Sequence, residues 1–506
     1  MKFARLSTAY TYMLKQYTVS VETDITRGLH SFAIVGLPDK GIEEARDRVS
    51  AAIKHAGFKS PKQKNEKVII SLAPAHIRKD GSAFDMAIAL SYLCAAEEIT
   101  FDSKGKMFVG ELALDGSLRP VRGVLPLVLH ARNKGYKEMY VPYHNAQEAS
   151  LVDGITVYGV LTLKELVEHL THTGITIAPQ ARTEIIREER VITHDFADIK
   201  GQAMAKRALE IAAAGGHNIC MYGPPGTGKT MLARAFAGIL PPLSFRDALE
   251  ITGIHSIAGI LEDQLIMYPP YRSPHHTSSY VSLVGGGSNP RPGEVTLAHR
   301  GVLFLDELPE FDKKVLECLR QPLEDRVITV ARAKGSVTYP AHVMLVAAMN
   351  PCPCGFRGSS QQACKCKPHD LARYERKISG PIIDRIDMWV EVSAIDHSVL
   401  LDNTQYGEAS KDIALRIAHT REIQIERYGK EKTNSELTAR DIKSQVNMSA
   451  AARTLLEQSA KHMMLSPRGF HRVIKLARTI ADIEECVCIE EKHILEALQY
   501  RPKVLE

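Results

Sequence analysis

The run from Gly223 to Thr230 constrains the fold of this 506-residue chain more than any other feature. It spells Gly-Pro-Pro-Gly-Thr-Gly-Lys-Thr, a complete phosphate-binding loop pattern. The apolar stretch Ile219–Tyr222 precedes it, and an apolar-periodic stretch over 231–240 follows it and stops at two prolines. This order predicts a buried strand, a glycine-rich loop and a helix.

Such a loop binds the phosphates of a nucleotide. Its glycines let backbone N–H groups turn inward around phosphate oxygens, and the helix N-terminus adds positive potential. Lys229 is expected to bridge the β- and γ-phosphates, and the Thr230 hydroxyl to hold Mg²⁺. The predicted cofactor-binding residues of the loop are Gly223, Pro224, Pro225, Gly226, Thr227, Gly228, Lys229 and Thr230.

A second run, Leu303 to Glu307, is an apolar strand that ends in two acids. At the carboxyl edge of a parallel sheet these acids would lie beside the phosphates. Asp306 is then a ligand of Mg²⁺, directly or through its water. Glu307 can take a proton from an attacking water, which a pure nucleotide-binding switch does not need. The two runs together predict an ATPase with ATP and Mg²⁺ as cofactors.

Composition narrows the class of protein. The chain is 44% hydrophobic, enough for several packed cores. We find no run near the ~18 apolar residues of a membrane helix and no signal-peptide pattern at the N-terminus, so we expect a cytoplasmic protein without a membrane partner. Its nine cysteines should then be reduced. A net charge of +5 permits nucleic-acid binding without arguing for it.

The pattern along the chain predicts an α/β protein of several domains. Residues 1–172 have a mixed α and β pattern, and 173–195 form a polar linker. Strands and helices alternate over 196–395, as in a doubly wound parallel sheet around the phosphate-binding loop. Helical periodicity dominates 396–506, which predicts a helical lid.

Five ordered segments make the chain resemble the magnesium-chelatase-like AAA+ family, and within it the YifB/ComM branch. They are 195–202, 271–277, 292–299, 379–387 and 465–471. The resemblance implies a hexameric ring motor that hydrolyses ATP on DNA. It implies branch-migration helicase activity in homologous recombination and natural transformation, with single-stranded, forked or branched DNA and other copies of the chain as partners.

The family pattern assigns roles to three further residues. Asn350 ends an apolar strand and matches the sensor that orients the attacking water with Glu307. Arg385 matches the finger that reaches the ATP of the neighbouring subunit, and Arg468 matches the lid sensor for the γ-phosphate. A local ion pair of Arg385 with Asp384 or Asp387 is the alternative.

The resemblance also places an insert over 243–300, containing Arg272, His275 and His276, towards the pore of the ring. The two histidines suit a structural or coupling role, with metal binding as the alternative. Farther on, residues 326–339 predict a β-hairpin with a basic tip, whose Arg332 and Lys334 are candidate DNA contacts. A solvated lysine is equally compatible with the residue types at the tip.

Four cysteines lie between Asn350 and Arg385 as two Cys-x-Cys pairs: Cys352, Cys354, Cys364 and Cys366. Four thiolates can surround one Zn²⁺ in a closed, structural site. His369 is an alternative fourth ligand, and reduced free thiols are the alternative to a metal.

Residues 79–90 and 110–123 resemble the proteolytic domain of Lon-type proteases. Lon chemistry needs a serine activated by a lysine. Gly81 is nearest the serine position, with Ser82 one step away, and the lysine position falls near Pro126 and Leu127. We therefore expect a Lon-protease-like domain without proteolytic activity.

Two other functions remain as alternatives to a DNA motor. The first is a chelatase-like ATPase that remodels a protein partner during metal insertion into a porphyrin. The second is an ATP-dependent protease, which the missing lysine argues against.

Overall fold

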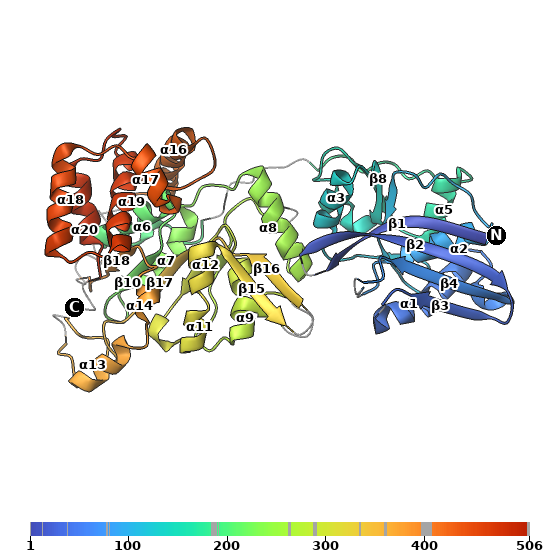
Figure 1. The fold of residues 1–506 in the computed structure, drawn as a ribbon, viewed down its shortest axis with the longest axis horizontal. Coiled ribbons are helices and arrows are strands. Elements are labelled where there is room, and N and C mark those ends of the chain that lie inside the picture. The colour runs from blue at the N-terminus through green and yellow to red at the C-terminus, as the bar shows by residue number, and fades with distance from the viewer. Residues whose placement is uncertain are drawn as a thin grey trace. The chain divides into compact units, whose positions relative to one another are not determined.

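The computed structural model describes residues 2–12, 14–37, 39–76, 79, 81–183, 190, 192–261, 265–286, 291–332, 335–358, 362–395 and 407–502. They belong to two compact units (Figure 1). Unit 1 comprises 1–187 together with 248–266, and unit 2 comprises 188–247 together with 267–506. Within the described ranges, no helix is long and apolar enough to cross a membrane.

Unit 1 contains a four-stranded sheet and a smaller parallel sheet. The first has the order β1 (Lys2–Tyr12), β2 (Lys15–Arg27), β4 (Glu66–Ala73) and β3 (Ser31–Val35). Only its β3–β4 pair is parallel. The second is β5 (Lys106–Phe108), β8 (Glu138–Pro142) and β9 (Thr156–Val160). A short hairpin joins β6 (Glu111–Leu112) to β7 (Leu118–Arg119).

Helices pack against these sheets. They are α1 (Lys40–His55), α2 (Asp85–Ala95), α3 (Val124–Asn133), α4 (Ala146–Ala149) and α5 (Leu163–Thr171), with 3₁₀ turns at Pro61–Gln63 and Tyr143–Asn145. Nearly every residue of α2 is buried, because the helix is apolar on all sides. Its buried Asp85 is paired with Arg48, whose Nε lies 2.9 Å from the carboxylate.

The long helix α8 (Phe245–Ala258) belongs to unit 1 from Ala248 onward. The hydroxyl of Ser256 donates to Glu148 at 2.6 Å and accepts from the N–H of Gly123 at 3.0 Å. Gly253 lies so close to Pro126 of α3 that a Cβ there would be 3.2 Å from the proline ring. A segment from the predicted insert of the ATPase core thus belongs to the N-terminal unit, while the predicted domain boundaries themselves stay a prediction.

Unit 2 is built on a five-stranded parallel sheet. Its order is β11 (Tyr271–Arg272), β14 (Val302–Leu305), β17 (Met344–Met349), β10 (Ile219–Tyr222) and β18 (Met388–Glu391). Every residue of β10, β14 and β17 is buried, as expected of parallel strands covered on both faces. The predicted strand at 219–222 is confirmed residue for residue, and all these strands end at one edge.

The sheet and the C-terminal helices share one hydrophobic core. Residues of α6 (Ala203–Gly215) and α7 (Lys229–Gly238) pack there with α16 (Ser410–Tyr428), α17 (Ala439–Gln445), α18 (Ala450–His462), α19 (Pro467–Ile483) and α20 (Glu491–Gln499). Ser449 and Ser466 cap α18 and α19 through their hydroxyls, which confirms helices in the predicted lid. The helices of the predicted lid and the parallel sheet therefore pack in one common core.

Short elements connect these layers. They are 3₁₀ turns at Phe196–Asp198, Leu308–Glu310 and Asn434–Glu436, helices α9 (Tyr280–Val284), α10 (Glu294–Leu297), α11 (Lys313–Glu317), α12 (Arg320–Asp325), α13 (Pro368–Glu375) and α14 (Gly380–Ile383), and the pair β12 (Gly285–Gly286) and β13 (Arg291–Pro292). The predicted hairpin is confirmed as β15 (Val327–Arg332) antiparallel to β16 (Gly335–Pro340). Lys334 and the side chain of Arg332 lie outside the described residues, so their DNA role stays a prediction.

Candidate functional site

The phosphate-binding loop turns sharply between β10 and α7. Gly226 and Gly228 have φ angles of 77° and 87°, in the left-handed region that favours glycine. At Gly223 a Cβ would lie 2.1 Å from the carbonyl oxygen of Val392, so a side chain has no room there. The Thr227 hydroxyl donates to the carbonyl of Pro224 at 3.0 Å and closes the loop. The loop therefore presents backbone at the N-terminus of α7.

Lys229 lies inside this loop, at the first turn of α7. Its Nζ donates to the carbonyls of Gly223 at 2.8 Å and Pro224 at 2.7 Å. It also donates to Oδ1 of Asn350 at 3.3 Å. Burial lowers the pKa of Lys229, while the nearby carboxylate of Asp306 opposes that shift. The structure thus brings the predicted phosphate lysine and the predicted sensor amide together at the edge of the sheet.

The two predicted Mg²⁺ ligands also meet. Thr230 Oγ1 donates to Oδ2 of Asp306 at 2.7 Å, and Oδ1 of the same carboxylate accepts the N–H of Glu307 at 2.9 Å. A hydroxyl and a carboxylate beside phosphate oxygens form the hard oxygen donor set that Mg²⁺ prefers. These residues therefore fit the ion.

Glu307, the predicted base, follows Asp306 at the end of β14. Its φ of 53° is unusual for a residue other than glycine, and the N–H of Glu310 donates to its carbonyl at 2.7 Å. Its carboxylate lies 3.4 Å from Nδ1 of His276. That histidine comes from the loop between β11 and α9, and its ring also packs edge-on to Phe311. The contact with Glu307 favours the coupling role for His276.

His275 faces a different neighbour. Its Nδ1 lies 2.8 Å from the hydroxyl of Thr277, and its ring lies 4.1 Å from that of His276, centroid to centroid. The two rings are thus in contact at a tilt of 33°, and of the two histidines only His276 has a described contact with the predicted base.

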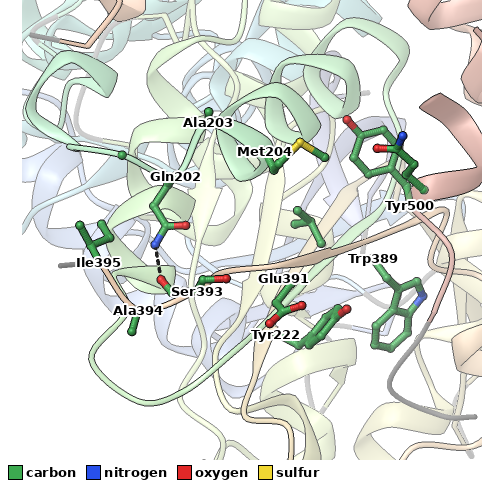
Figure 2. Close-up of a pocket in the computed structure, with 13 residues that line it drawn as sticks. Gln202, Ala203, Met204, Tyr222, Trp389, Glu391, Ser393, Ala394, Ile395 and Tyr500 are labelled. Carbon is green, nitrogen blue, oxygen red and sulfur yellow. Dashed lines mark hydrogen bonds between the residues drawn. The ribbon is translucent and has the colours of Figure 1, made fainter. Parts of the chain in front are cut away.

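Sequence reasoning missed a cavity of about 600 Å³ beside the loop (Figure 2). Gln202 joins the two, because its side-chain NH₂ donates to the carbonyl of Ser393 at 2.7 Å and of Thr227 at 3.4 Å. Aromatic side chains face the same space: Tyr222, Trp389 and Tyr500. Gly201 and Gln202 both have positive φ angles, a local signal that the chain turns closely here. An apolar cavity next to a phosphate loop suits a nucleotide base.

Arg385 and Arg468 converge on one carboxylate. Nη2 of Arg385 contacts Oε2 of Glu324, and Nη2 of Arg468 lies 3.0 Å from Oε1 of the same residue. Asp384 and Asp387, the expected local partners of Arg385, contact other residues. Asp384 lies 3.4 Å from Arg472, and Asp387 accepts the N–H of Asn218 at 3.0 Å. Sequence reasoning did not identify Glu324.

Comparison with known proteins identifies the family. Three family models match in order: "Subunit ChlI of Mg-chelatase" over 21–145, "Magnesium chelatase, subunit ChlI" over 195–400, and "Magnesium chelatase, subunit ChlI C-terminal" over 407–501. The chain is 41% identical to Competence protein ComM of Haemophilus influenzae over 496 residues, covering 96% of this chain and 95% of that protein. It belongs to the ComM/YifB family of magnesium-chelatase-like proteins.

Two other relatives bear on this assignment. Protein YifB of Escherichia coli is 39% identical over 486 residues, which cover 96% of this chain and 94% of YifB. Lon protease 2 of Bacillus subtilis is 33% identical over 117 residues, which are 23% of this chain and 21% of that protein. Membership of the ComM/YifB family implies ATP and Mg²⁺, which the arrangement of Lys229, Thr230 and Asp306 fits.

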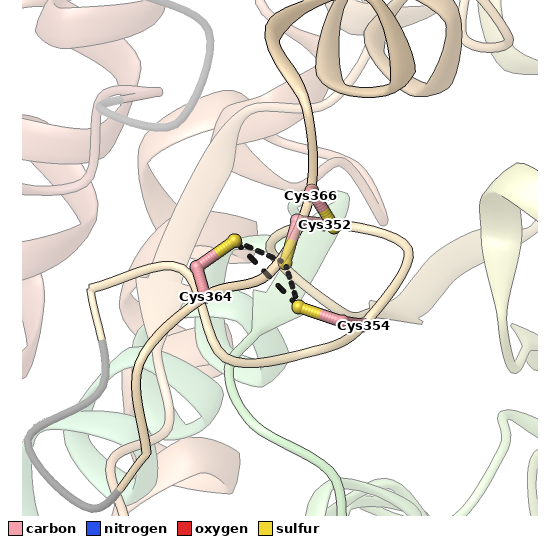
Figure 3. Close-up of side chains that lie close together, drawn as sticks. All are labelled: Cys352, Cys354, Cys364 and Cys366. Atoms are coloured by element: carbon pink, nitrogen blue, oxygen red, sulfur yellow. Dashed lines mark hydrogen bonds between the residues drawn. The ribbon is translucent and has the colours of Figure 1, made fainter.

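In this ComM/YifB-family chain the four predicted metal ligands lie together (Figure 3). The sulfur of Cys352 lies 3.4 Å from that of Cys354 and 3.7 Å from that of Cys364, and Cys354 lies 3.6 Å from Cys364. All four sulfurs, including that of Cys366, lie within 4.8 Å of one another. Tetrahedral zinc with Zn–S bonds of about 2.3 Å needs sulfur separations of about 3.8 Å.

The thiols of the cluster differ in their electrostatics, since desolvation and hydrogen bonds with neighbouring thiols raise the pKa of Cys364 and of Cys366. Backbone N–H groups of Phe356 and Lys365 lower the pKa of Cys354 to about 6, which favours the thiolate that ligates zinc. The alternative ligand His369 lies 3.2 Å from Asp370 and outside this group. The four thiols therefore fit zinc without His369 as a ligand.

The cysteine cluster is connected to the nucleotide site. A Cβ on Gly355, which has a φ of 85°, would lie 2.7 Å from the ring of Pro225. On the other side, the Tyr374 hydroxyl donates to the carbonyl of Asn350 at 3.2 Å. The segment that carries the thiols thus packs directly on the phosphate-binding loop.

Proposed function

We propose that this protein is an ATP-hydrolysing hexameric ring motor on DNA, a branch-migration helicase that supports homologous recombination and natural transformation. The observation that carries the ATPase part is the meeting of Lys229, Thr230, Asp306 and Asn350 at one sheet edge. The DNA part is supported by near full-length similarity to a protein named for competence. A cytoplasmic location belongs to the same proposal.

Each residue of the site has one task in this proposal. The N–H groups of the loop and Lys229 bind the phosphates, and Thr230 with Asp306 holds Mg²⁺, which offsets phosphate charge. Glu307 takes the proton of the attacking water, and Asn350 orients that water. The cavity behind Gln202 receives the base.

The two arginines act on the ATP of a second copy. Among their described contacts neither touches the phosphate-binding loop of its own subunit, and both point to Glu324. Because they share one anion, Arg385 and Arg468 would reach a neighbouring phosphoryl group together and offset its developing charge. In this proposal Arg468 therefore works across the subunit interface, as Arg385 does.

The four cysteines would hold one structural zinc ion, which needs no open coordination position. We propose that Zn²⁺ there braces the segment on which Pro225 and Asn350 rest. Unit 1 would be a Lon-protease-like scaffold without a catalytic dyad. Its Ser82 hydroxyl donates to Glu111, and Pro126 and Leu127 are buried in α3.

The deciding experiment measures ATP hydrolysis with forked DNA, four-way DNA and no DNA, with Lys229→Ala as the blank. We expect branched DNA to raise the rate of hydrolysis. We also expect the protein to dissociate labelled four-way junctions into duplexes only when ATP is present. Unchanged hydrolysis on every DNA would remove the DNA motor from the proposal.

The second candidate is a chelatase-like ATPase that remodels a protein, which the descriptions of all three matching family models favour. Stimulation of hydrolysis by a co-purifying protein, with none by DNA, is the result that selects it. Peptide cleavage that depends on ATP would instead select a protease.

A further inference from the structure

A cavity of about 510 Å³ in unit 2 is lined by five cations and by the carboxylates of Glu324, Asp384, Asp387 and Glu436. Its lining includes Arg326, Arg385, Arg468, Arg472 and Lys475. These come from separate parts of the chain, and α19 supplies three of them. Pockets lined by guanidinium groups are suited to phosphate and carboxylate ligands.

Most of these cations are held by partners at the wall. Arg326 lies 2.8 Å from Glu436, and Arg472 donates to the carbonyl of Ile386 at 2.7 Å. Lys475 donates to the carbonyl of Ser435 at 2.8 Å. Arg385 likewise donates from Nη1 to the carbonyl of Pro381 at 2.7 Å, which leaves its Nη2 and Arg468 to bind an anion.

Those two, Arg385 and Arg468, share Glu324, and each takes a different oxygen of its carboxylate. Two positive charges thus face one negative charge. The side chain of Arg385 is only 14% exposed, and its Nε is buried without a hydrogen-bond partner among the described residues. The pair therefore retains unused capacity for an anion with more charge and more acceptor oxygens than a carboxylate.

We propose that Glu324 is an internal substitute for a phosphoryl group. It holds Arg385 and Arg468 together in the isolated subunit and gives them up to the terminal phosphate of ATP bound by a second copy. This inference rests on the proposed function, in which both arginines act across the subunit interface.

The physical reason is competition for the same donors. A phosphoryl group carries more negative charge than a carboxylate and has three acceptor oxygens, so it binds a preformed pair of guanidiniums more strongly. Glu324 keeps that pair in place beforehand, which reduces the ordering needed at the interface. Its negative charge, however, opposes the approach of a phosphate, so the isolated subunit is restrained.

Glu324 is also placed to transmit its displacement. It lies in the last turn of α12, three residues before β15 begins at Val327. Moving its side chain off the arginines would release the start of the hairpin β15–β16. Phosphate binding by one subunit is thereby linked to the hairpin of its neighbour.

The test compares the wild type with Glu324→Gln, which keeps the shape and one acceptor oxygen but removes the charge. ATPase rate per subunit is measured against protein concentration at saturating ATP and Mg²⁺. We expect the concentration for half-maximal rate to fall at least about threefold, since like-charge repulsion across the interface is relieved. Binding of a fluorescent ATP analogue to dilute subunits should not change.

Glu317→Gln is the matched control, because Glu317 pairs with Arg320 outside the cavity lining. In an Arg385→Ala, Arg468→Ala background, which hydrolyses ATP poorly, the comparison uses ATP-dependent assembly of subunits measured by sedimentation. The effect of Glu324→Gln should vanish there, because no arginine pair is left to release. Melting temperatures establish that each variant folds, and Glu324→Ala serves if the glutamine variant does not.

An unchanged concentration dependence, or an effect that persists without both arginines, would overturn the role of Glu324. That failure differs from failure of the proposed function. If Arg385→Ala alone hydrolyses ATP at the wild-type rate, the finger itself is wrong. If Arg385→Ala is inactive and Glu324→Gln is indistinguishable from wild type, only the internal-substitute role is lost.

Discussion

The Thr230 hydroxyl donates to the Asp306 carboxylate at 2.7 Å across a separation of 76 residues. Thr230 lies in the first turn of α7, the helix that follows β10, and Asp306 follows β14, which is two positions from β10 in the sheet order β14-β17-β10. Their meeting places both proposed Mg²⁺ ligands beside Lys229, while the proposed base Glu307 is a separate residue. Mutations at Lys229 and at Glu307 can therefore separate ATP binding from ATP hydrolysis.

Lys229→Ala should abolish nucleotide binding, whereas Glu307→Gln should bind ATP and lose hydrolysis by about 10²-fold or more, because only the transition state needs the base. Glu307→Gln should therefore accumulate ATP-bound oligomers. Equilibrium binding and single-turnover hydrolysis check both results. Wild-type turnover by the Glu307 variant would remove it from the base role.

Arg385→Ala and Arg468→Ala subunits should each bind ATP and hydrolyse it poorly. Mixed with Lys229→Ala subunits, either should recover activity, because an intact Lys229 then faces intact arginines. Random mixing in equal amounts gives about a quarter of the wild-type rate in a head-to-tail ring. Recovery with Arg385→Ala but not with Arg468→Ala, in rings confirmed as mixed, would show that Arg468 acts on the ATP of its own subunit.

Purified without chelators, the protein should carry about one zinc ion per chain. Replacing Cys352 and Cys354 by serine should release it and lower hydrolysis or ring assembly, while ATP binding at Lys229 survives. Elemental analysis checks the metal directly. The exposed Cys488, replaced by serine, is the control and should leave the zinc in place. Absence of zinc or iron near one per chain would leave four reduced thiols.

Gln202→Ala should weaken ATP binding about fivefold, because it removes the hydrogen bonds that hold Ser393 and Thr227 beside the cavity. A fivefold loss corresponds to about 1 kcal/mol, the net contribution of one such bond. The rate at saturating ATP should stay near that of the wild type. Titration with ATP and with inorganic triphosphate separates the contributions. Equal losses for the two ligands would show that the cavity does not hold the base.

His276→Ala should lower the rate at saturating ATP about tenfold and leave KM unchanged, since His276 touches Glu307 and, among the described contacts, no residue of the phosphate loop. His276→Gln, which keeps a polar group near the carboxylate, should restore part of the rate. His275→Ala separates loss of the contact between the two rings from loss of the contact with Glu307, because His275 touches His276 and Thr277. A change confined to KM would contradict the positioning role.

Much of this chain was predictable because the signals are local. The strand, loop and helix of the phosphate site follow one another in sequence, so glycine φ angles and apolar periodicity determine them without distant contacts. The hairpin of β15 and β16 and the cysteine cluster likewise join residues close along the chain. The ordered segments 195–202, 271–277, 292–299, 379–387 and 465–471 were sufficient to predict the family.

Other parts of the site depend on packing between distant segments. His276 meets Glu307 only because β11 and β14 are neighbours in the sheet. The cavity beside Gln202 forms where α6, β18 and the end of α20 come together. Nothing in the residue types of these segments specified which partners they would face.

The sequence by itself determined the phosphate-binding loop and the acidic strand, because each is formed by neighbouring residues whose backbone preferences act locally. It also determined the family, through ordered segments of the chain. Only the tertiary structure decided that Arg385 and Arg468 share Glu324, which lies 61 and 144 residues away from them. Contacts at such separations are set by how helices and strands pack in the common core, and charged side chains accept any opposite charge that packing brings within reach.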